Sequence, residues 1–139
     1  KYLLPLAAGA LVAAAAAAQA ASSSANFDVS VTVAKNCTIS ATNIDFGSVT
    51  NLSGQVANGT ITANCSSGAV YNMGLASTNV SLVGATSNIP ATLTFAADGA
   101  SQTGNGANQN FPVTAALPNT GMAPDNGVYT GTATVNINF

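Results

Sequence analysis

The sequence predicts an all-β domain, and three observations support this. Beyond residue 20, apolar and polar residues alternate over short stretches, as they do in strands with one buried face. Clusters of Gly, Asn, Pro and Ser separate these stretches, which is typical of β-sandwiches and barrels. No stretch in this part of the sequence keeps the 3.6-residue period of an amphipathic helix.

The first twenty residues predict a secretory signal peptide. Lys1 precedes an apolar run over residues 3–18, and Ala18-Gln19-Ala20 supplies the small-x-small pattern of a cleavage site. We expect residues 1–20 to be removed before Ala21. A membrane helix is the alternative, but the run is shorter than the roughly 20 residues that a bilayer requires, and it is mostly alanine.

The predicted strands follow the alternating stretches in order. They cover residues 27–33, 37–40, 44–49, 55–65, 69–76, 79–83, 91–97, 111–117 and 128–139, with 79–83 a possible continuation of 69–76 after a turn. Asn58-Gly59 predicts a bend or bulge. Pro90 and Pro112 predict edge strands, because proline cannot donate to a central ladder. Residues 98–110 and 117–127 are expected to be loops.

Charge is scarce, which excludes several functions. The mature chain, residues 21–139, suits one domain, and Lys35 is its only basic residue because it contains no Arg and no His. Binding to nucleic acid or to an anionic membrane surface requires several Lys or Arg side chains. We therefore expect no nucleic-acid partner and no stable membrane insertion of the mature chain.

The residues that catalysis requires are missing. The sequence has no His and no Glu, and its four Asp residues are scattered at positions 28, 45, 98 and 125. A Ser–Lys pair could formally use Lys35, but that residue is more simply a solvated side chain beside Cys37. Gly104-Asn105-Gly106 lacks the strand-to-helix context and the Lys of a phosphate loop. We expect no enzyme activity, no cofactor and no metal site.

The two cysteines, Cys37 and Cys65, predict a disulfide. With a signal peptide present, an even pair indicates oxidation outside the cytoplasm. A two-thiolate metal site would need further ligands, and no His is available. Closing a loop of this length contributes roughly 3–4 kcal/mol on the chain-entropy estimate.

The N-terminal alternating stretch permits two interpretations. Phe27, Val29, Val31 and Val33 share one face of a strand, which only Ala34, Lys35 and Asn36 separate from Cys37. The strand could join the protein's own sheet, or it could be donated to another molecule, as in pilins. The alternation alone favours the first interpretation.

Five motifs in order carry a resemblance to a known family. They are residues 33–40 (Val-Ala-Lys-Asn-Cys-Thr-Ile-Ser), 44–47 (Ile-Asp-Phe-Gly), 61–65 (Ile-Thr-Ala-Asn-Cys), 127–132 (Gly-Val-Tyr-Thr-Gly-Thr) and 135–139 (Val-Asn-Ile-Asn-Phe). Together they resemble the spore coat protein U-like domain, which includes the major pilins of archaic (Csu-type) chaperone–usher pili. The resemblance covers essentially the whole mature chain.

The resemblance implies an incomplete immunoglobulin-like β-sandwich, completed by a donated N-terminal strand of a neighbouring subunit. Residues 21–36 would form the donor strand and a short linker, and residues 37–139 the pilin domain. The donor segment would fall within residues 22–34. The side chains entering the neighbour's groove would be those of Phe27, Val29, Val31 and Val33. Those of Val135, Ile137 and Phe139 would line the acceptor side and pair with a chaperone.

The implied function is that of a major pilin in an extracellular adhesive pilus. Its expected partners are identical subunits, a periplasmic chaperone and an outer-membrane usher, on a route through the periplasm to the cell surface. Two departures from classical pilins affect the donor register: one segment precedes Cys37, and Asn138 replaces the penultimate Tyr. The alternatives are a monomeric secreted binding module and a spore or cyst coat component. A binding module would need exposed aromatic platforms, and the mature chain has no Trp and only Tyr71 and Tyr129.

Overall fold

The structure, a computed structural model, describes residues 22–139 and contains no helix in that range. None of these residues forms a helix long and apolar enough to cross a membrane. The predicted signal peptide, residues 1–20, lies outside the described residues. The chain divides into two units, one ending at Thr32 and the other spanning Val33–Phe139, and each is described by itself. The second unit, called the β-domain below, confirms the predicted all-β class.

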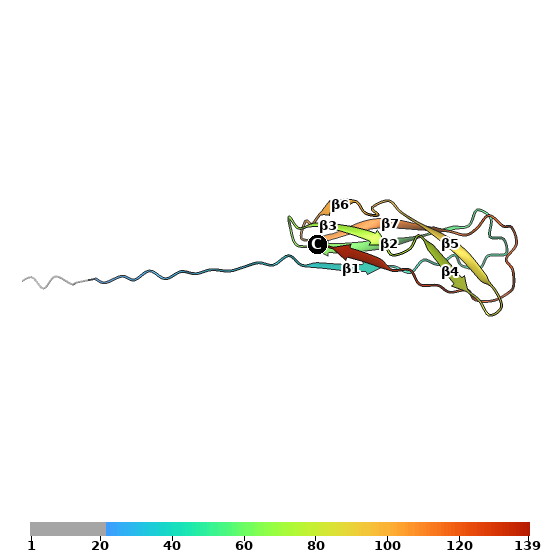
Figure 1. The fold of residues 1–139 in the computed structure, drawn as a ribbon, viewed down its shortest axis with the longest axis horizontal. Helices are drawn as coiled ribbons and strands as arrows, with labels where there is room; N and C mark the ends of the chain where they lie inside the picture. Colours follow the sequence, from blue (N-terminus) through green and yellow to red (C-terminus); the bar gives the residue numbers. More distant parts are fainter. Residues whose placement is uncertain (1–21) are drawn as a thin grey trace, which may run out of the picture. The chain divides into compact units, whose positions relative to one another are not determined.

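The β-domain consists of two antiparallel sheets (Figure 1). The five-stranded sheet has the order β1-β2-β7-β5-β4, with β1 at Cys37–Ala41, β2 at Val56–Cys65, β7 at Asn108–Ala116, β5 at Asn88–Phe95 and β4 at Asn79–Val83. The three-stranded sheet has the order β6-β3-β8, with β6 at Ser101–Thr103, β3 at Val70–Leu75 and β8 at Val135–Asn138. The result is an incomplete sandwich, because a groove described below separates two parts of its core.

The alternation of the sequence sets which face of each strand is buried. In β5, Ile89, Ala91, Leu93 and Phe95 are buried, and the residues between them are exposed. β2 shows the same period, with each odd-numbered residue from Ala57 to Cys65 buried. Each strand therefore buries one apolar face, as two facing sheets require.

The two strand prolines lie in central strands, so the prediction of edge strands was wrong. β5 and β7 pair only over Thr92–Phe95 and Val113–Ala116. Pro90 precedes that shared stretch and is matched only with Ser81 of β4, and Pro112 also lies just outside it and is matched only with Thr60 of β2. Each proline thus has a free side where its missing N–H removes no ladder bond.

The predicted bulge at Asn58-Gly59 is absent. β2 and β7 stay in continuous register through this point, with Asn58 opposite Thr114 and Gly59 opposite Val113. Gly59 is required for another reason, because a Cβ there would lie 2.7 Å from Ile44 Cγ1. The glycine lets the segment containing Ile44 cross directly over the strand.

Several predicted boundaries also differ. Residues 44–49 form no strand, and 79–83 pairs with β5 in the opposite sheet instead of extending β3. The expected loop 98–110 contains β6 and the start of β7. The terminal strand begins only at Val135, because the chain before it passes from one sheet to the other. Residues 22–36 form no strand in this structure.

Candidate functional site

The core of the β-domain is divided into two clusters. One surrounds the disulfide end and includes Ile61, Tyr71, Met73 and Phe95. The other lies toward the opposite end and consists of Leu52, Ile89, Ala91 and Leu117. Ala57, Leu93 and Ala115 are buried, yet they belong to neither cluster. The packing of the sandwich is therefore interrupted along its length.

A groove of about 1070 Å³ coincides with this interruption. Its floor is the inner face of the five-stranded sheet, including Leu93, Val113 and Ala115. One side, called the first wall, is formed by residues 41–50, and the other, called the second wall, by residues 125–135. The groove is thus an apolar trough between two stretches of chain that form no regular sheet with each other.

The second wall is fixed at both ends. Thr130 and Val83 exchange backbone hydrogen bonds of 2.8 and 3.2 Å, which attach the wall to β4. At the other end, Ala76 N–H donates to Thr134 C=O at 2.9 Å and extends the pairing of β3 with β8. The wall therefore passes from the edge of one sheet to the edge of the other and leaves the space beneath it open.

Tyr129 anchors the second wall. Its hydroxyl lies 2.9 Å from Ser87 Oγ and donates to Asp125 C=O at 3.2 Å. Its ring occupies the space where a side chain at Gly84 would stand, since a Cβ there would overlap the ring carbons. The Gly-Val-Tyr-Thr-Gly motif of the sequence thus builds the groove wall, with Tyr129 as its fixed point.

The first wall is held by local turns and by apolar contacts. Asp45 Oδ1 accepts from Gly47 N–H at 2.7 Å, and Gly47 has a φ of +66°, which favours glycine. Ile44 packs against the disulfide-side cluster, whereas Phe46 and Val49 pack against the other cluster. The Ile-Asp-Phe-Gly motif therefore connects the two core clusters along one side of the groove, without forming the predicted strand.

β8 presents the predicted acceptor residues beside the groove. Val135 and Ile137 are half-buried against the disulfide-side cluster, and Val135 also lines the groove. Phe139 is 56% exposed. β8 pairs with β3 along one side only, so its other edge has no sheet partner among residues 22–139. Such an edge can accept a further strand.

The predicted donor residues are extended along an unpaired segment. Phe27, Val29, Val31 and Val33 are 83–86% exposed. Residues 22–36 make no sheet pairing in the described structure. An exposed apolar face of this kind is a feature that calls for an explanation.

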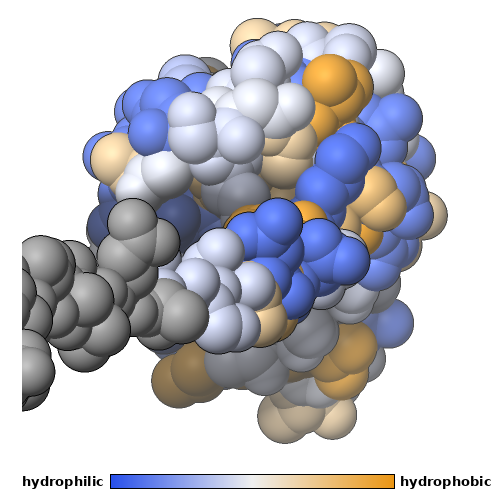
Figure 2. Space-filling view, turned by 90° about the vertical axis from the view of Figure 1, so that its left-hand side faces the viewer, coloured by the Kyte–Doolittle hydropathy of each residue, from blue (hydrophilic) through white to orange (hydrophobic). Residues whose placement is uncertain are grey.

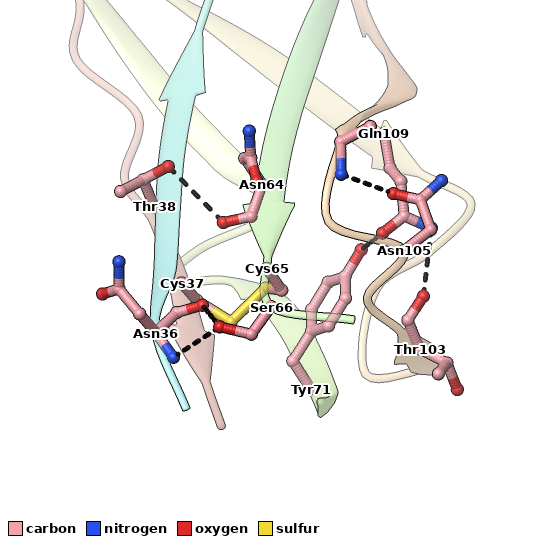
Figure 3. The surroundings of a disulfide bond; sticks show 11 residues. Asn36, Cys37, Thr38, Asn64, Cys65, Ser66, Tyr71, Thr103, Asn105 and Gln109 are labelled. Carbon is pink, nitrogen blue, oxygen red and sulfur yellow. Dashed lines mark hydrogen bonds between the residues drawn. A yellow bond between two sulfur atoms is a disulfide. The ribbon is translucent and has the colours of Figure 1, made fainter. Parts of the chain in front are cut away.

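The segment joins the β-domain beside the disulfide (Figure 3). Cys37 and Cys65 face each other in the β1–β2 register and are bonded, which confirms the predicted disulfide. Next to it, Asn36 N–H donates to Ser66 Oγ at 3.1 Å, and Ser66 N–H donates to Asn36 C=O at 2.9 Å. Only Ala34 and Lys35 separate Val33 from this anchored residue.

Three of the titratable side chains in the described part of the chain make hydrogen bonds that hold the fold together. Asp98 Oδ1 accepts from Leu75 N–H at 2.9 Å, and Asp125 Oδ2 accepts from Thr86 and Ser87 hydroxyls. Burial raises the pKa of the Tyr71 hydroxyl, which donates to Gln109 Oε1 at 3.0 Å. No group of three or more His, Cys, Asp or Glu side chains gathers among residues 22–139 in a metal-binding arrangement.

The disulfide end of the β-domain has an ordinary surface. Hydrophilic and weakly polar residues cover most of it, with hydrophobic residues scattered between them (Figure 2). Isolated apolar residues of this kind are normal on protein surfaces. The groove and the alternating segment are therefore the features that require a functional explanation.

Comparison with protein families gives a match over residues 23–88 to the Spore Coat Protein U domain. Over these residues the chain is similar to that domain. This finding confirms the resemblance predicted from the sequence motifs. The matched range contains the alternating segment, both cysteines and the first wall, whereas the second wall lies beyond it.

A solved structure has a fold similar to that of this chain. It is one chain of the crystal structure of the CsuC–CsuE chaperone–tip adhesion subunit pre-assembly complex, from archaic chaperone–usher Csu pili of Acinetobacter baumannii. The TM-score is 0.56 at 20% sequence identity, and the match covers 78% of this chain and 40% of that chain. Comparison with curated proteins gives no match.

Sequence reasoning missed most of the groove. It identified Val135, but not the floor residues Leu93 and Ala115 or the wall residues 125–134. Alternation indicated that Leu93 is buried. It did not indicate that the layer above Leu93 would be left open, because that depends on how the chain passes between sheets.

Proposed function

We propose that this chain is a non-enzymatic structural subunit, the major pilin, of an extracellular adhesive chaperone–usher pilus. In this proposal the β-domain accepts the N-terminal segment of a neighbouring identical subunit as its missing strand. The observation that carries the proposal is the groove of about 1070 Å³, which divides the core and has an apolar floor.

The N-terminal segment has the properties that such a groove requires. Phe27, Val29, Val31 and Val33 all lie on one face of an extended chain, so all four could point to the floor at once. From Phe27 to Val33 an extended strand spans about 20 Å. The second wall, residues 125–135, is a longer stretch of chain, so the segment could lie along part of it.

Backbone pairing would add to the apolar contacts. A donated strand lying beside β8 would use that strand's unpaired edge, with Val135, Ile137 and Phe139 as its neighbours on the acceptor side. This is strand addition, in which backbone hydrogen bonds supply affinity and alternate side chains supply specificity.

The energies favour a long-lived junction. Full burial of four large apolar side chains contributes about 1.5–3 kcal/mol each. These side chains would rejoin the two core clusters, so removing the strand would require reopening the acceptor's core. Slow dissociation and resistance to denaturants are the expected consequences.

The assembly route follows from the same groove. An apolar groove beside an open edge is an aggregation hazard until it is covered. We infer that a periplasmic chaperone covers it first, and that an outer-membrane usher then exchanges the chaperone for the next subunit. The spore coat protein U match and the likeness to a chain of a chaperone–subunit complex support this route. The predicted signal peptide, residues 1–20, and the disulfide agree with passage through an oxidising periplasm.

The first test compares surface-sheared material from cells that express the full chain with material from a deletion of residues 22–34 that keeps the signal peptide. Both samples are run on an SDS gel with and without boiling. We expect a ladder of multimers in the unboiled full-length sample, collapse to monomer on boiling, and no ladder from the deletion.

A replacement variant makes the test independent of folding. Replacing residues 22–34 by a polar Gly/Ser segment of equal length preserves the spacing to Asn36 and removes only the apolar face. A soluble monomer from this variant supports the proposal. A monomer band alone from the unboiled full-length chain would instead indicate a monomeric secreted binding module.

A further inference from the structure

The sequence contains Asn-Gly pairs at residues 58–59, 105–106 and 126–127. In such a pair the glycine amide nitrogen can attack the Asn side-chain carbonyl and form a five-membered succinimide ring. Glycine permits this most readily, because it has no Cβ to obstruct the attack and its backbone adopts many conformations. The fold decides which of the three pairs can react.

Asn58-Gly59 is locked in a central strand. Both residues lie in the continuous register of β2 and β7, and Gly59 is buried. Asn58 Oδ1 also accepts from Thr114 Oγ1 at 2.9 Å. Ring closure would require this part of the ladder to open first.

Asn105-Gly106 is exposed, but its reacting atoms are engaged. The Gly106 amide, which would be the nucleophile, donates to Cys65 C=O at 3.0 Å. Asn105 Oδ1 accepts from Ala107 N–H at 2.9 Å, so the side chain that would be attacked is held as well. This pair is therefore protected by its turn and not by burial.

Asn126-Gly127 lacks both forms of protection. Both residues are exposed, and within residues 22–139 neither the Gly127 amide nor the Asn126 side chain makes a hydrogen bond. The residues on either side are held, since Asp125 accepts from Thr86 and Ser87, and Tyr129 bonds Ser87. The reactive pair therefore lies between two residues that hydrogen bonds hold in place, Asp125 and Tyr129.

We propose that Asn126-Gly127 is a site of spontaneous succinimide formation and deamidation in the folded subunit. The Gly127 nitrogen loses its proton to solvent base and bonds to Asn126 Cγ, and the side-chain nitrogen leaves as ammonia. Water then opens the ring at either carbonyl, which gives aspartate or isoaspartate. No oxidant, reductant or enzyme takes part.

The position of the pair gives the reaction a consequence for the groove. Asp125, Asn126 and Gly127 all line the second wall. Conversion adds a carboxylate beside Asp125, and the isoaspartyl product also adds one carbon to the main chain. Subunits that age in this way acquire charge at the mouth of an apolar groove.

The test is incubation of the folded, disulfide-bonded full chain at mildly alkaline pH, with peptide mass spectrometry at intervals. We expect Asn126 to convert at least about tenfold faster than Asn58 and Asn105, because the protected pairs react only through local opening. In the reduced chain in denaturant the three rates should become similar.

Gly127→Ala is the matched variant. No atom lies within 4 Å of a Cβ at Gly127, so the fold should tolerate the change while the added methyl slows ring closure about tenfold or more. Equal conversion of Asn105 and Asn126 in the folded chain would overturn the proposal, as would an intact Asn126 after Asn105 has reacted. Neither result depends on whether the chain polymerises.

Discussion

Gly131 lies directly against Val80, and a Cβ at Gly131 would stand 2.7 Å from Val80 Cγ1. The same Cβ would lie 2.8 Å from Ser81 C=O, which is backbone and cannot move aside. The close approach of the second wall to β4 therefore depends on the absence of a side chain at this one position.

Gly131→Ala should displace the second wall. Because overpacking of this kind typically costs about 1–3 kcal/mol, we expect the urea midpoint of the full chain to fall accordingly. Gly127→Ala, four residues earlier in the same wall, meets no atom within 4 Å and serves as the control. Equal midpoints for both variants would contradict the account of the wall.

Ala115→Leu should fill the gap between the two core clusters from within. Ala115 is buried on the groove floor and belongs to neither cluster, so a larger side chain would occupy space assigned here to the donated strand. We expect a folded subunit that no longer forms the SDS-resistant ladder. Ala96→Leu makes the same change at an exposed position directly after β5 and should leave the ladder intact.

Val31→Asp should abolish polymerisation while leaving a foldable monomer. A carboxylate on the apolar face of the segment would have to be buried without a partner, which costs several kcal/mol. Ser30→Asp places the same charge on the opposite face and should polymerise normally. The readout is the unboiled gel of sheared material, and normal fibres from Val31→Asp would exclude residues 22–34 as the donor.

Cys37→Ser should lower both the yield and the thermal stability of the subunit. Loss of a native disulfide in a small secreted domain typically costs about 2–5 kcal/mol. Scanning calorimetry under oxidising and reducing conditions provides the measurement. The melting temperature of the substituted chain should not change when reductant is added. A substituted chain that melts at the same temperature as the parent would argue against a stabilising role for the bond.

Tyr71→Phe should remove about 0.5–1.5 kcal/mol at neutral pH through the lost hydrogen bond to Gln109. Burial raises the pKa of Tyr71 above 10.0, so the folded state disfavours the phenolate. The stability that this group contributes is complete below pH 10 and is lost as pH rises through the higher folded-state pKa. Urea titrations at neutral and alkaline pH should therefore show a smaller alkaline decline for Tyr71→Phe than for the parent chain.

The sequence predicted the fold class because alternation records burial directly. Ile89, Ala91, Leu93 and Phe95 alternate in the chain and are buried in β5, as expected. The disulfide was equally predictable, since the sequence contains no other cysteine with which Cys37 or Cys65 could pair. These features depend on local pattern or on residue inventory alone.

Features that depend on what lies opposite a segment were not accessible from local pattern. Residues 44–49 and 128–134 have strand-like sequences, yet they form the groove walls without sheet partners on their open sides. Pro90 and Pro112 wrongly predicted edge strands. β5 and β7 pair over only part of their lengths, which frees one side of each proline, and neither strand's sequence alone reveals this. The groove floor was missed for the same reason.

The hydrogen bonds between Asn36 and Ser66 bear on how tension would travel along the proposed fibre. A pull on the segment before Asn36 reaches Ser66 and, through the Cys37–Cys65 bond, the end of β2. β2 is paired on both sides, so the load enters the middle of the five-stranded sheet and does not peel β1 from its edge. In the proposed fibre, the covalent link would thereby leave the groove, held by contacts along its length, as the part of each junction that yields first under force.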